Sequence, residues 1–191
     1  RFRSAEGELH YGFVVRLLND LFGIQARGGC SCAGPYGHSL LQLTPEYSSS
    51  LADAVADGYG CLRPGWVRFN LHWLCSEDEV DYILAAVKMI AKRGRLLLPA
   101  YALDTASGLW EHRDSPTAQP ISLDPFPASA ETPPPKQEAV AATTLLKEAE
   151  QTLRAGATDS HRAHAIKAHQ SAPWPDKMES LCWFLRPHED A

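Results

Sequence analysis

The most informative stretch of the sequence runs from Asn19 to His38 and reads NDLFGIQARGGCSCAGPYGH. Apolar residues recur at helical spacing up to Phe22, and Gly23 is typical of a helix C-terminus. Ile24 to Arg27 predicts a short strand. The run from Gly28 to Pro35 holds too many glycines for a regular element and predicts a loop. Glycines let a ligand approach the backbone closely, so this loop is a candidate for ligand contact.

The elements on either side of this stretch are marked by apolar periodicity and by turn residues. One helical face consists of Phe13, Val14, Leu17, Leu18, Leu21 and Phe22. Downstream, the pattern predicts a weaker helix over 46–57, a strand over 66–73, a helix from 77 to 93, and strands over 96–103 and 109–113 that form a hairpin. This order predicts an α+β (α/β) fold, with helices packed on a small, mainly antiparallel sheet.

The strongest local signals surround the helix that follows Cys75. Ser76 suits the N-cap position, Glu79 completes a capping box, and Gly94 ends the helix. The apolar stripe of this helix consists of Val80, Ile83, Leu84, Val87, Ile90 and Ala91. In the strand before it, one apolar face consists of Val67, Phe69, Leu71 and Trp73. Arg68 lies on the opposite face of that strand.

Composition divides the 191 residues into three parts. Residues 1–113 mix apolar and polar positions and form the expected folded domain. Residues 114–136 hold seven of the 14 prolines and predict a Pro-rich linker. Residues 137–191 predict a helical tail, with a helix over 137–155 and a C-terminal aromatic segment that we expect to dock on a larger body.

Charge and hydropathy exclude two classes of partner. The net charge of −5, from 18 Lys and Arg against 23 Asp and Glu, lacks the basic footprint of a nucleic-acid-binding protein. No apolar run is long enough to cross a membrane. The start of the sequence resembles no secretory signal and lacks an initiator methionine, so we expect a chain that begins within a longer protein or has been processed.

The five cysteines are too few and too scattered to predict a disulfide framework. We therefore expect a reducing compartment, either the cytoplasm or an organellar matrix. His161, His164 and His169 have spacings that a metal ion can use, but no cysteine or carboxylate cluster completes a site, and we expect no metal.

Two residue types carry the candidate chemistry. A cysteine on a glycine-rich loop near cations can have a lowered pKa and act as a nucleophile, which makes Cys32 a candidate, with Arg27 five residues before it. The alternative is an inert cysteine in a tight turn. The guanidinium of Arg68 suits a bidentate grip on a carboxylate, and the alternative is an ion pair with a neighbouring Asp or Glu.

The run from Asn19 to His38 resembles the C-terminal domain of class V aminotransferases, the fold-type I pyridoxal 5′-phosphate (PLP) enzymes that include cysteine desulfurases and selenocysteine lyases. The similarity continues through Pro64–Asn70 and Ser76–Ile83, and it extends through the Tyr101–Arg113 hairpin. It resumes at Trp183–Leu185, which looks like the family's C-terminus. The resemblance covers the first 113 residues well and the tail poorly.

The resemblance implies a function and three site residues. Cys32 matches the persulfide-forming cysteine of one desulfurase group, Arg68 matches the arginine that holds the substrate α-carboxylate, and Arg27 matches a second arginine beside the cysteine loop. The implied chemistry on an amino-acid substrate is C–S cleavage, a related lyase reaction or transamination. The parent enzyme would be a homodimer. The desulfurase group usually has two histidines before the cysteine, whereas this chain has Cys30 and Ser31.

The family places its Schiff-base lysine, the acidic partner of the pyridinium nitrogen and the phosphate-binding loop on a large domain upstream. No lysine of this sequence matches the Schiff-base position. We therefore expect PLP in a full-length parent and no cofactor on this chain alone. The alternative function is that of a catalytically inactive fragment that acts as an interaction module, as a sulfur acceptor or as a redox module built on Cys30 and Cys32.

Overall fold

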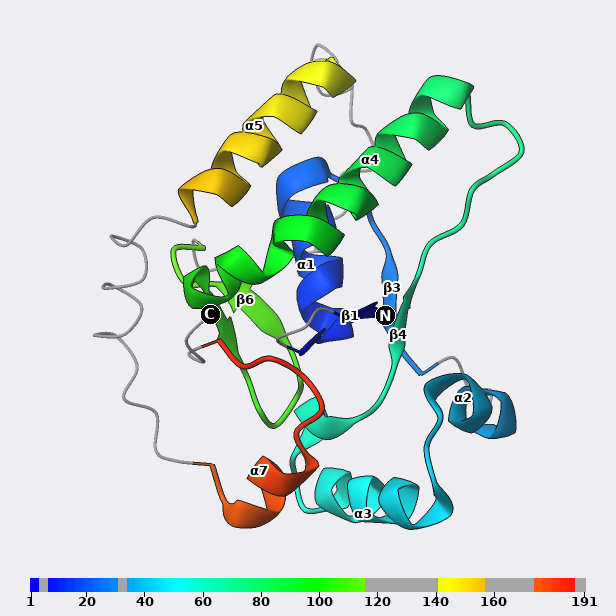
Figure 1. Cartoon of the computed structure of the whole chain (residues 1–191), viewed down its shortest axis with the longest axis vertical. Helices are drawn as coiled ribbons and strands as arrows, with labels where there is room; N and C mark the ends of the chain where they lie inside the picture. The colour runs from blue at the N-terminus through cyan, green and yellow to red at the C-terminus, as the bar shows by residue number, and fades with distance from the viewer. Residues whose placement is uncertain (4–6, 31–33, 116–140, 157–173, 188–191) are drawn as a thin grey trace, which may run out of the picture.

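The computed structural model describes residues 1–3, 7–30, 34–115, 141–156 and 174–187. Helix α1 lies at the centre, α4 and α5 pack on it and on each other, and α3, η1 and α7 gather at the other end (Figure 1). The helices are α1 Tyr11–Phe22, α2 Gly34–Leu41, α3 Pro45–Ala56, α4 Glu77–Arg93, α5 Ala142–Ala155 and α7 Asp176–Leu181, with 3₁₀ turns η1 Gly60–Leu62 and η2 Gly94–Ala100. The strands are β1 Phe2–Arg3, β2 Glu8–Leu9, β3 Arg27–Gly29, β4 Trp66–Arg68, β5 Tyr101–Leu103 and β6 Trp110–His112.

The described strands form three small antiparallel pairs, β1–β2, β3–β4 and β5–β6. The hairpin predicted from Leu96 to Arg113 is confirmed as β5–β6, although its strands are shorter than predicted. Residues 94–100 instead form η2, which contains Pro99. Helices packed around antiparallel strands make this an α+β fold, as the sequence predicts.

Helix α1 supplies the centre of the core. Its five buried residues are Phe13, Val14, Leu17, Leu18 and Phe22, which confirms the predicted face. At the N-terminus, the side chain of His10 caps the helix by accepting a hydrogen bond from the N–H of Gly12. At the C-terminus, Gly23 adopts a left-handed conformation with φ of 64°, which a residue with a Cβ adopts only at a cost.

Helix α4 begins with the predicted capping box. The hydroxyl of Ser76 accepts from the N–H of Glu79, and the carboxylate of Glu79 accepts from the N–H of Ser76 at 2.7 Å. These hydrogen bonds lower the pKa of Glu79. The predicted stripe is partly wrong, because Leu84 and Ala91 are exposed while Ala86 and Ile90 are fully buried.

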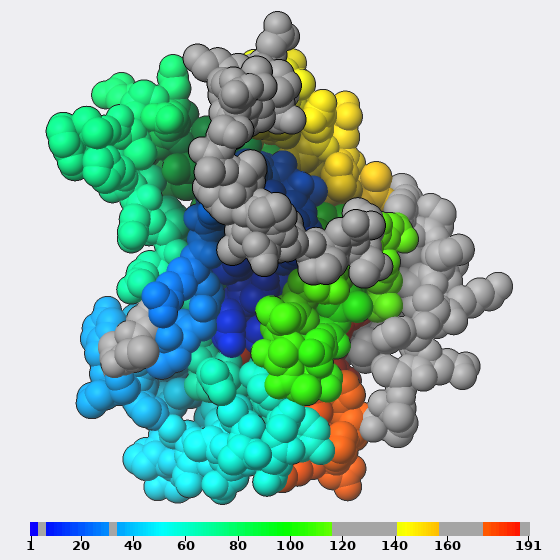
Figure 2. Space-filling model, turned by 180° about the vertical axis from the view of Figure 1, so that it is seen from behind, coloured from blue at the N-terminus to red at the C-terminus, as the bar shows by residue number. Residues whose placement is uncertain are grey.

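The first turns of α4 and the loop before it stand out from the body, at the upper left of Figure 2. This position explains the half-exposed start of the predicted stripe. The same loop overturns part of the strand predicted over 66–73. The strand β4 ends at Arg68, and the exposed fractions of Leu71 and Trp73 are 46% and 84%. Strand β4 ends at Arg68 because its antiparallel partner β3 begins at Arg27, the residue that pairs with Arg68.

The strand predicted over Ile24–Arg27 is displaced. The observed strand β3 begins at Arg27 and includes Gly28 and Gly29, which the sequence predicted as loop. At the other end of the predicted loop, Gly34 and Pro35 open α2. The weaker helix predicted over 46–57 is confirmed as α3, where Thr44 caps the N-terminus and Pro45 occupies the first turn.

The C-terminal aromatic segment, residues 174–187, docks on the domain as predicted. The indole N–H of Trp183 donates to the carbonyl of Leu62 at 3.1 Å, and the N–H of Leu185 donates to the carbonyl of Glu8 at 2.8 Å. Phe184 is buried against His10. Residues 116–136 of the linker predicted over 114–136, and residues 137–140 of the helix predicted over 137–155, lie outside the described residues.

Four cysteines lie within the described residues. Cys30, Cys61 and Cys75 are free thiols, and the thiol of Cys182 donates to the carbonyl of Phe184 at 3.3 Å. No helix in the described part of the chain combines the length and the apolar character that crossing a bilayer requires. Those residues also hold no group of three or more His, Cys, Asp or Glu side chains placed for a metal ion. His161, His164 and His169 lie outside the described ranges.

Candidate functional site

The structure brings Arg27 and Arg68 together on β3–β4. Antiparallel pairing makes their Cα atoms direct partners, and both side chains are exposed. Within the described residues neither guanidinium has an ion pair, so the alternative of a structural salt bridge for Arg68 finds no acidic partner there. Two like charges opposite one another in a sheet are destabilising unless an anion joins them. The pair is therefore a candidate anion site.

Three glycines allow this sheet to lie directly on α1. A Cβ on Gly65 would lie 2.6 Å from the Cα of Gly29 and 2.8 Å from the ring of Tyr11. A Cβ on Gly28 would lie 2.9 Å from the same ring and 3.0 Å from Val15. Such distances are too short for any side chain, so β3–β4 keeps this position only with glycine there. The ring of Tyr11 packs against the sheet at Gly28, Gly29 and Gly65.

The cysteine loop begins beside this pair. Cys30 follows β3 directly and is exposed, while the predicted nucleophile Cys32 lies outside the described residues. The phenol of Tyr11 faces this region. Burial raises the pKa of Tyr11, the positive charge of Arg63 opposes that rise, and the thiols of Cys61 and Cys30 add to it. The described residues thus place a phenol, a thiol and several guanidinium groups around the start of the loop.

His38, which closes the matching stretch, has a structural role in the described fold. Its Nδ1–H donates to the carbonyl of Gly34 at 2.7 Å, and its Nε2 accepts from the hydroxyl of Ser48 at 2.5 Å. The first bond lies within α2, and the second ties α2 to α3. Because both ring nitrogens are engaged, His38 is not poised to contact a substrate.

The described residues do not fit PLP by themselves. Their lysines are Lys88, Lys92, Lys147 and Lys177, and all are exposed. Lys177 pairs with Asp57 at 2.6 Å. Lys92 borders a cavity of about 30 Å³, which holds about one water molecule. A cofactor site typically encloses about 300–1,000 Å³. No described lysine therefore stands in a cavity that PLP could enter.

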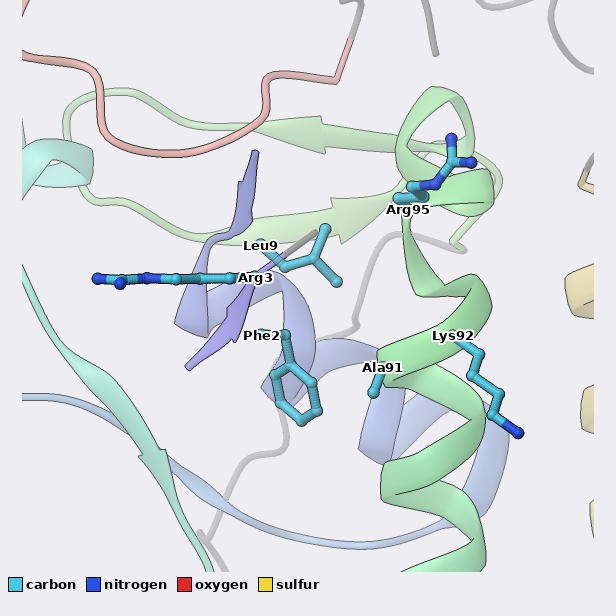
Figure 3. A pocket seen from close by; sticks show the side chains of 6 residues that line it. All are labelled: Phe2, Arg3, Leu9, Ala91, Lys92 and Arg95. Atoms are coloured by element: carbon cyan, nitrogen blue, oxygen red, sulfur yellow. The ribbon is translucent and has the colours of Figure 1, made fainter. Parts of the chain in front are cut away.

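Figure 3 shows why this small cavity is not an anion site either. Its floor consists of Phe2, Leu9 and Ala91. The charged ends of Arg3 and Lys92 point away from the cavity in opposite directions, and that of Arg95 points away as well. Arg3 is also paired with Glu8 at 3.0 Å. The cavity is an apolar notch between β1–β2 and α4.

Sequence reasoning missed Tyr11, which became visible only when its contacts with β3 and β4 were known. The available signal was the pair Gly28 and Gly29 in β3 together with Gly65 directly before β4, because positions without a side chain leave room for a large ring. Comparison of the chain with family models, with curated proteins and with solved structures finds no match.

Proposed function

We propose that this chain supplies the carboxylate-binding side of an amino-acid site in a PLP-dependent enzyme of the class V aminotransferase type. In this proposal the chain is the small C-terminal domain, and a separate cofactor-bearing domain completes the site. The observation that carries the proposal is the pairing of Arg27 with Arg68 on exposed adjacent strands without an acidic partner in the described residues. The resemblance of the Asn19–His38 stretch to that family supports the same assignment.

The chemistry assigned to this chain is binding and orientation. The planar guanidinium of Arg68 donates two parallel hydrogen bonds to a carboxylate, and Arg27 adds a second positive charge from the facing strand. A fixed carboxylate leaves the rest of the amino acid directed along the sheet toward the loop that holds Cys30 and Cys32. Under the proposal, Cys32 is the group that accepts sulfur when the substrate is cysteine. If the reaction is instead a lyase reaction or a transamination, the two arginines bind the substrate carboxylate and Cys32 has no role.

The arginine pair can be tested on the chain itself by NMR. We expect L-alanine and acetate to shift the Nε–H signals of Arg27 and Arg68 with a dissociation constant on the order of millimolar, because each charge-assisted hydrogen bond contributes about 1.5–3 kcal/mol before entropy is lost. Arg68→Gln should abolish both shifts. Its thermal stability should equal or slightly exceed that of the parent chain, because a like-charge pair is removed.

The matched control is Arg154→Gln, which removes an arginine that is paired with Glu150 on α5. This control should leave the carboxylate-induced shifts unchanged. Methylammonium, which carries no carboxylate, should shift neither signal. If Arg27 and Arg68 do not respond to any carboxylate, the proposed function is wrong.

A second measurement tests whether the chain holds the cofactor alone. We expect PLP followed by borohydride to give no single dominant lysine adduct by mass spectrometry, because the described lysines are exposed and border no cofactor-sized cavity. Scattered, substoichiometric labelling fits this expectation. Stoichiometric labelling of one lysine would contradict it and would place a cofactor site on this chain.

The second candidate function is an interaction or sulfur-accepting module without a catalytic site. The exposed thiol of Cys30 favours it, because an accessible thiol can accept sulfur or form a mixed disulfide. A chain that reacts with a persulfide donor at Cys30 or Cys32, yet shows no carboxylate response at the arginine pair, would favour this function over the first.

A further inference from the structure

We propose that Trp183, in the C-terminal segment, positions the arginine-bearing strands β3 and β4 by holding Tyr11 and the start of the β4 segment in place. The inference deepens the proposed function and rests on it where carboxylate binding is concerned. It assigns a role to the C-terminal aromatic segment, for which sequence patterns predicted docking and nothing more. Trp183 is a positioning residue in this proposal, because it acts through Tyr11 and Leu62.

The first contact runs through Tyr11. The indole of Trp183 lies nearly parallel to the ring of Tyr11, with centroids 6.2 Å apart and 20° between the planes. His10 completes the cluster, at 4.3 Å from Tyr11 and 5.3 Å from Trp183. The ring of Tyr11 also lies against Gly28 and Gly29 of β3 and against Gly65, directly before β4. A displacement of the Tyr11 ring therefore moves the surface on which the two strands rest.

The second contact is a hydrogen bond to the chain that leads into β4. The indole N–H of Trp183 donates to the carbonyl of Leu62 at 3.1 Å, four residues before β4 begins. Trp183 also lines a cavity of about 130 Å³ together with Pro64 and Gly65. The indole thus holds the segment from Leu62 to Gly65 from one side, while Tyr11 supports Gly65 from another.

Both contacts support the end of the sheet from which the pairing of β3 with β4 continues to Arg27 and Arg68. Gly65 directly precedes Trp66, whose Cα partner is Gly29, and two residues further Arg68 pairs with Arg27. This is a sheet of three residues per strand, and within the described residues it has no further strand beside it. Such a sheet owes its geometry to the surfaces that it packs on, because two short strands are marginal by themselves. Removing the indole loosens both surfaces.

The chain offers a matched control in the same segment. Trp174 also packs on Phe184, at 6.3 Å between centroids, and carries the guanidinium of Arg186 at 5.2 Å. Within the described residues, Trp174 forms no ring contact with Tyr11 and no hydrogen bond with Leu62. Trp174→Ala therefore removes an indole from the same segment without touching the route to β3–β4.

The test combines amide hydrogen exchange with the carboxylate titration. We expect Trp183→Ala to accelerate exchange in residues 27–29 and 66–68 and to raise the dissociation constant of acetate roughly fivefold, a size typical of coupling through packed side chains. Trp174→Ala should leave both quantities near those of the parent chain. Tyr11→Phe keeps the ring and should bind acetate normally, while Tyr11→Leu should weaken binding as Trp183→Ala does.

A double variant separates coupling from general loosening. If Trp183 acts through Tyr11, adding Trp183→Ala to Tyr11→Leu should weaken acetate binding by much less than in the parent background. Equal effects of Trp183→Ala and Trp174→Ala, or additive effects in the double variant, would overturn the proposal. If Trp183→Ala does not fold, Trp183→Leu replaces it in these experiments.

The amide hydrogen-exchange measurement tests the role of Trp183 independently of the proposed function. If the parent chain binds no carboxylate, the proposed function fails, and the exchange rates of β3 and β4 still decide whether Trp183 positions them. Faster exchange confined to these strands supports the positioning role. Unchanged exchange in Trp183→Ala overturns it even when the arginine pair binds acetate.

Discussion

Gly60→Ala is expected to destabilise the fold by about 3–5 kcal/mol, a large part of the stability of an ordinary domain. A Cβ on Gly60 would lie 2.1 Å from the carbonyl oxygen of Ala106 and 3.1 Å from its carbonyl carbon. Neither group can move freely, because the N–H of Gly60 donates to this same oxygen at 3.1 Å and the N–H of Cys61 donates to Thr105 at 3.1 Å. The turn of the β5–β6 hairpin would have to separate from η1.

Urea unfolding followed by circular dichroism measures this loss. Gly34→Ala is the control, because a Cβ on Gly34 meets nothing within 4 Å and that glycine lies in α2. It should change the free energy of unfolding by less than about 1 kcal/mol, with a small gain from helix propensity. A Gly60→Ala variant as stable as the Gly34→Ala variant would show that η1 and the hairpin turn do not pack as described.

The second large effect is acid destabilisation through His10. Burial lowers the pKa of this imidazole from 6.5 to about 4, although its hydrogen bond to Cys61 opposes the shift. Its Nδ1 accepts from the N–H groups of Gly12 and Trp110, at 3.0 and 2.9 Å, and its Nε2–H donates to the carbonyl of Cys61 at 3.1 Å. A second ring proton has no acceptor, because Nδ1 already faces two donors.

The sign follows from proton binding. Between pH 6.5 and 4 the unfolded chain binds a proton at His10 that the folded chain does not, so stability falls as the pH falls through this window. The full loss from this residue is about 3 kcal/mol. Above pH 6.5 the imidazole is neutral in both states and its contribution does not change with pH.

His10→Gln tests this assignment, because glutamine offers an acceptor and a donor but does not titrate. The variant should be less stable than the parent chain at pH 7.5, since the geometry of the cap is altered. The stability difference should shrink by about 3 kcal/mol on going to pH 4. The carboxylate of Asp104 does not interfere, because hydrogen bonds from Ser107 and from the N–H of Ala106 lower its pKa from 3.8, below this window. A stability difference that is constant with pH would show that His10 does not carry the acid sensitivity.

Helices α1, α3, α4 and α5 were predictable because their signals are local, whereas α2 and α7 were not predicted. Ser76, Glu79 and Gly94 mark α4 within the sequence, and each occupies the predicted position at a helix end. The ends of the short strands were not predictable, because they depend on pairing between residues that are distant in the sequence. The alternation of apolar and polar residues continues past Arg68 to Trp73. The strand β4 nevertheless ends at Arg68, whose partner Arg27 is the first residue of β3. Trp73 is consequently exposed, against the prediction from its pattern.

The candidate site was also predictable only in part. The sequence singled out Arg27 and Arg68 by residue type and resemblance, and antiparallel pairing places them side by side. It could not predict that Tyr11 supports β3–β4, because the contact depends on where α1 lies relative to Gly28 and Gly65. Cys32 lies outside the described residues and stays a prediction.

The contact of Leu185 with Glu8 has a consequence for synthesis on the ribosome. Translation produces α1 well before Trp183 and Phe184, which contact His10 at the start of that helix. Until then the nascent chain exposes the aromatic surface around His10. Contacts between residues so far apart in sequence form slowly, and exposed apolar surface favours aggregation in the interval. The aromatic surface around His10 is therefore covered only after Trp183 and Phe184 have left the exit tunnel.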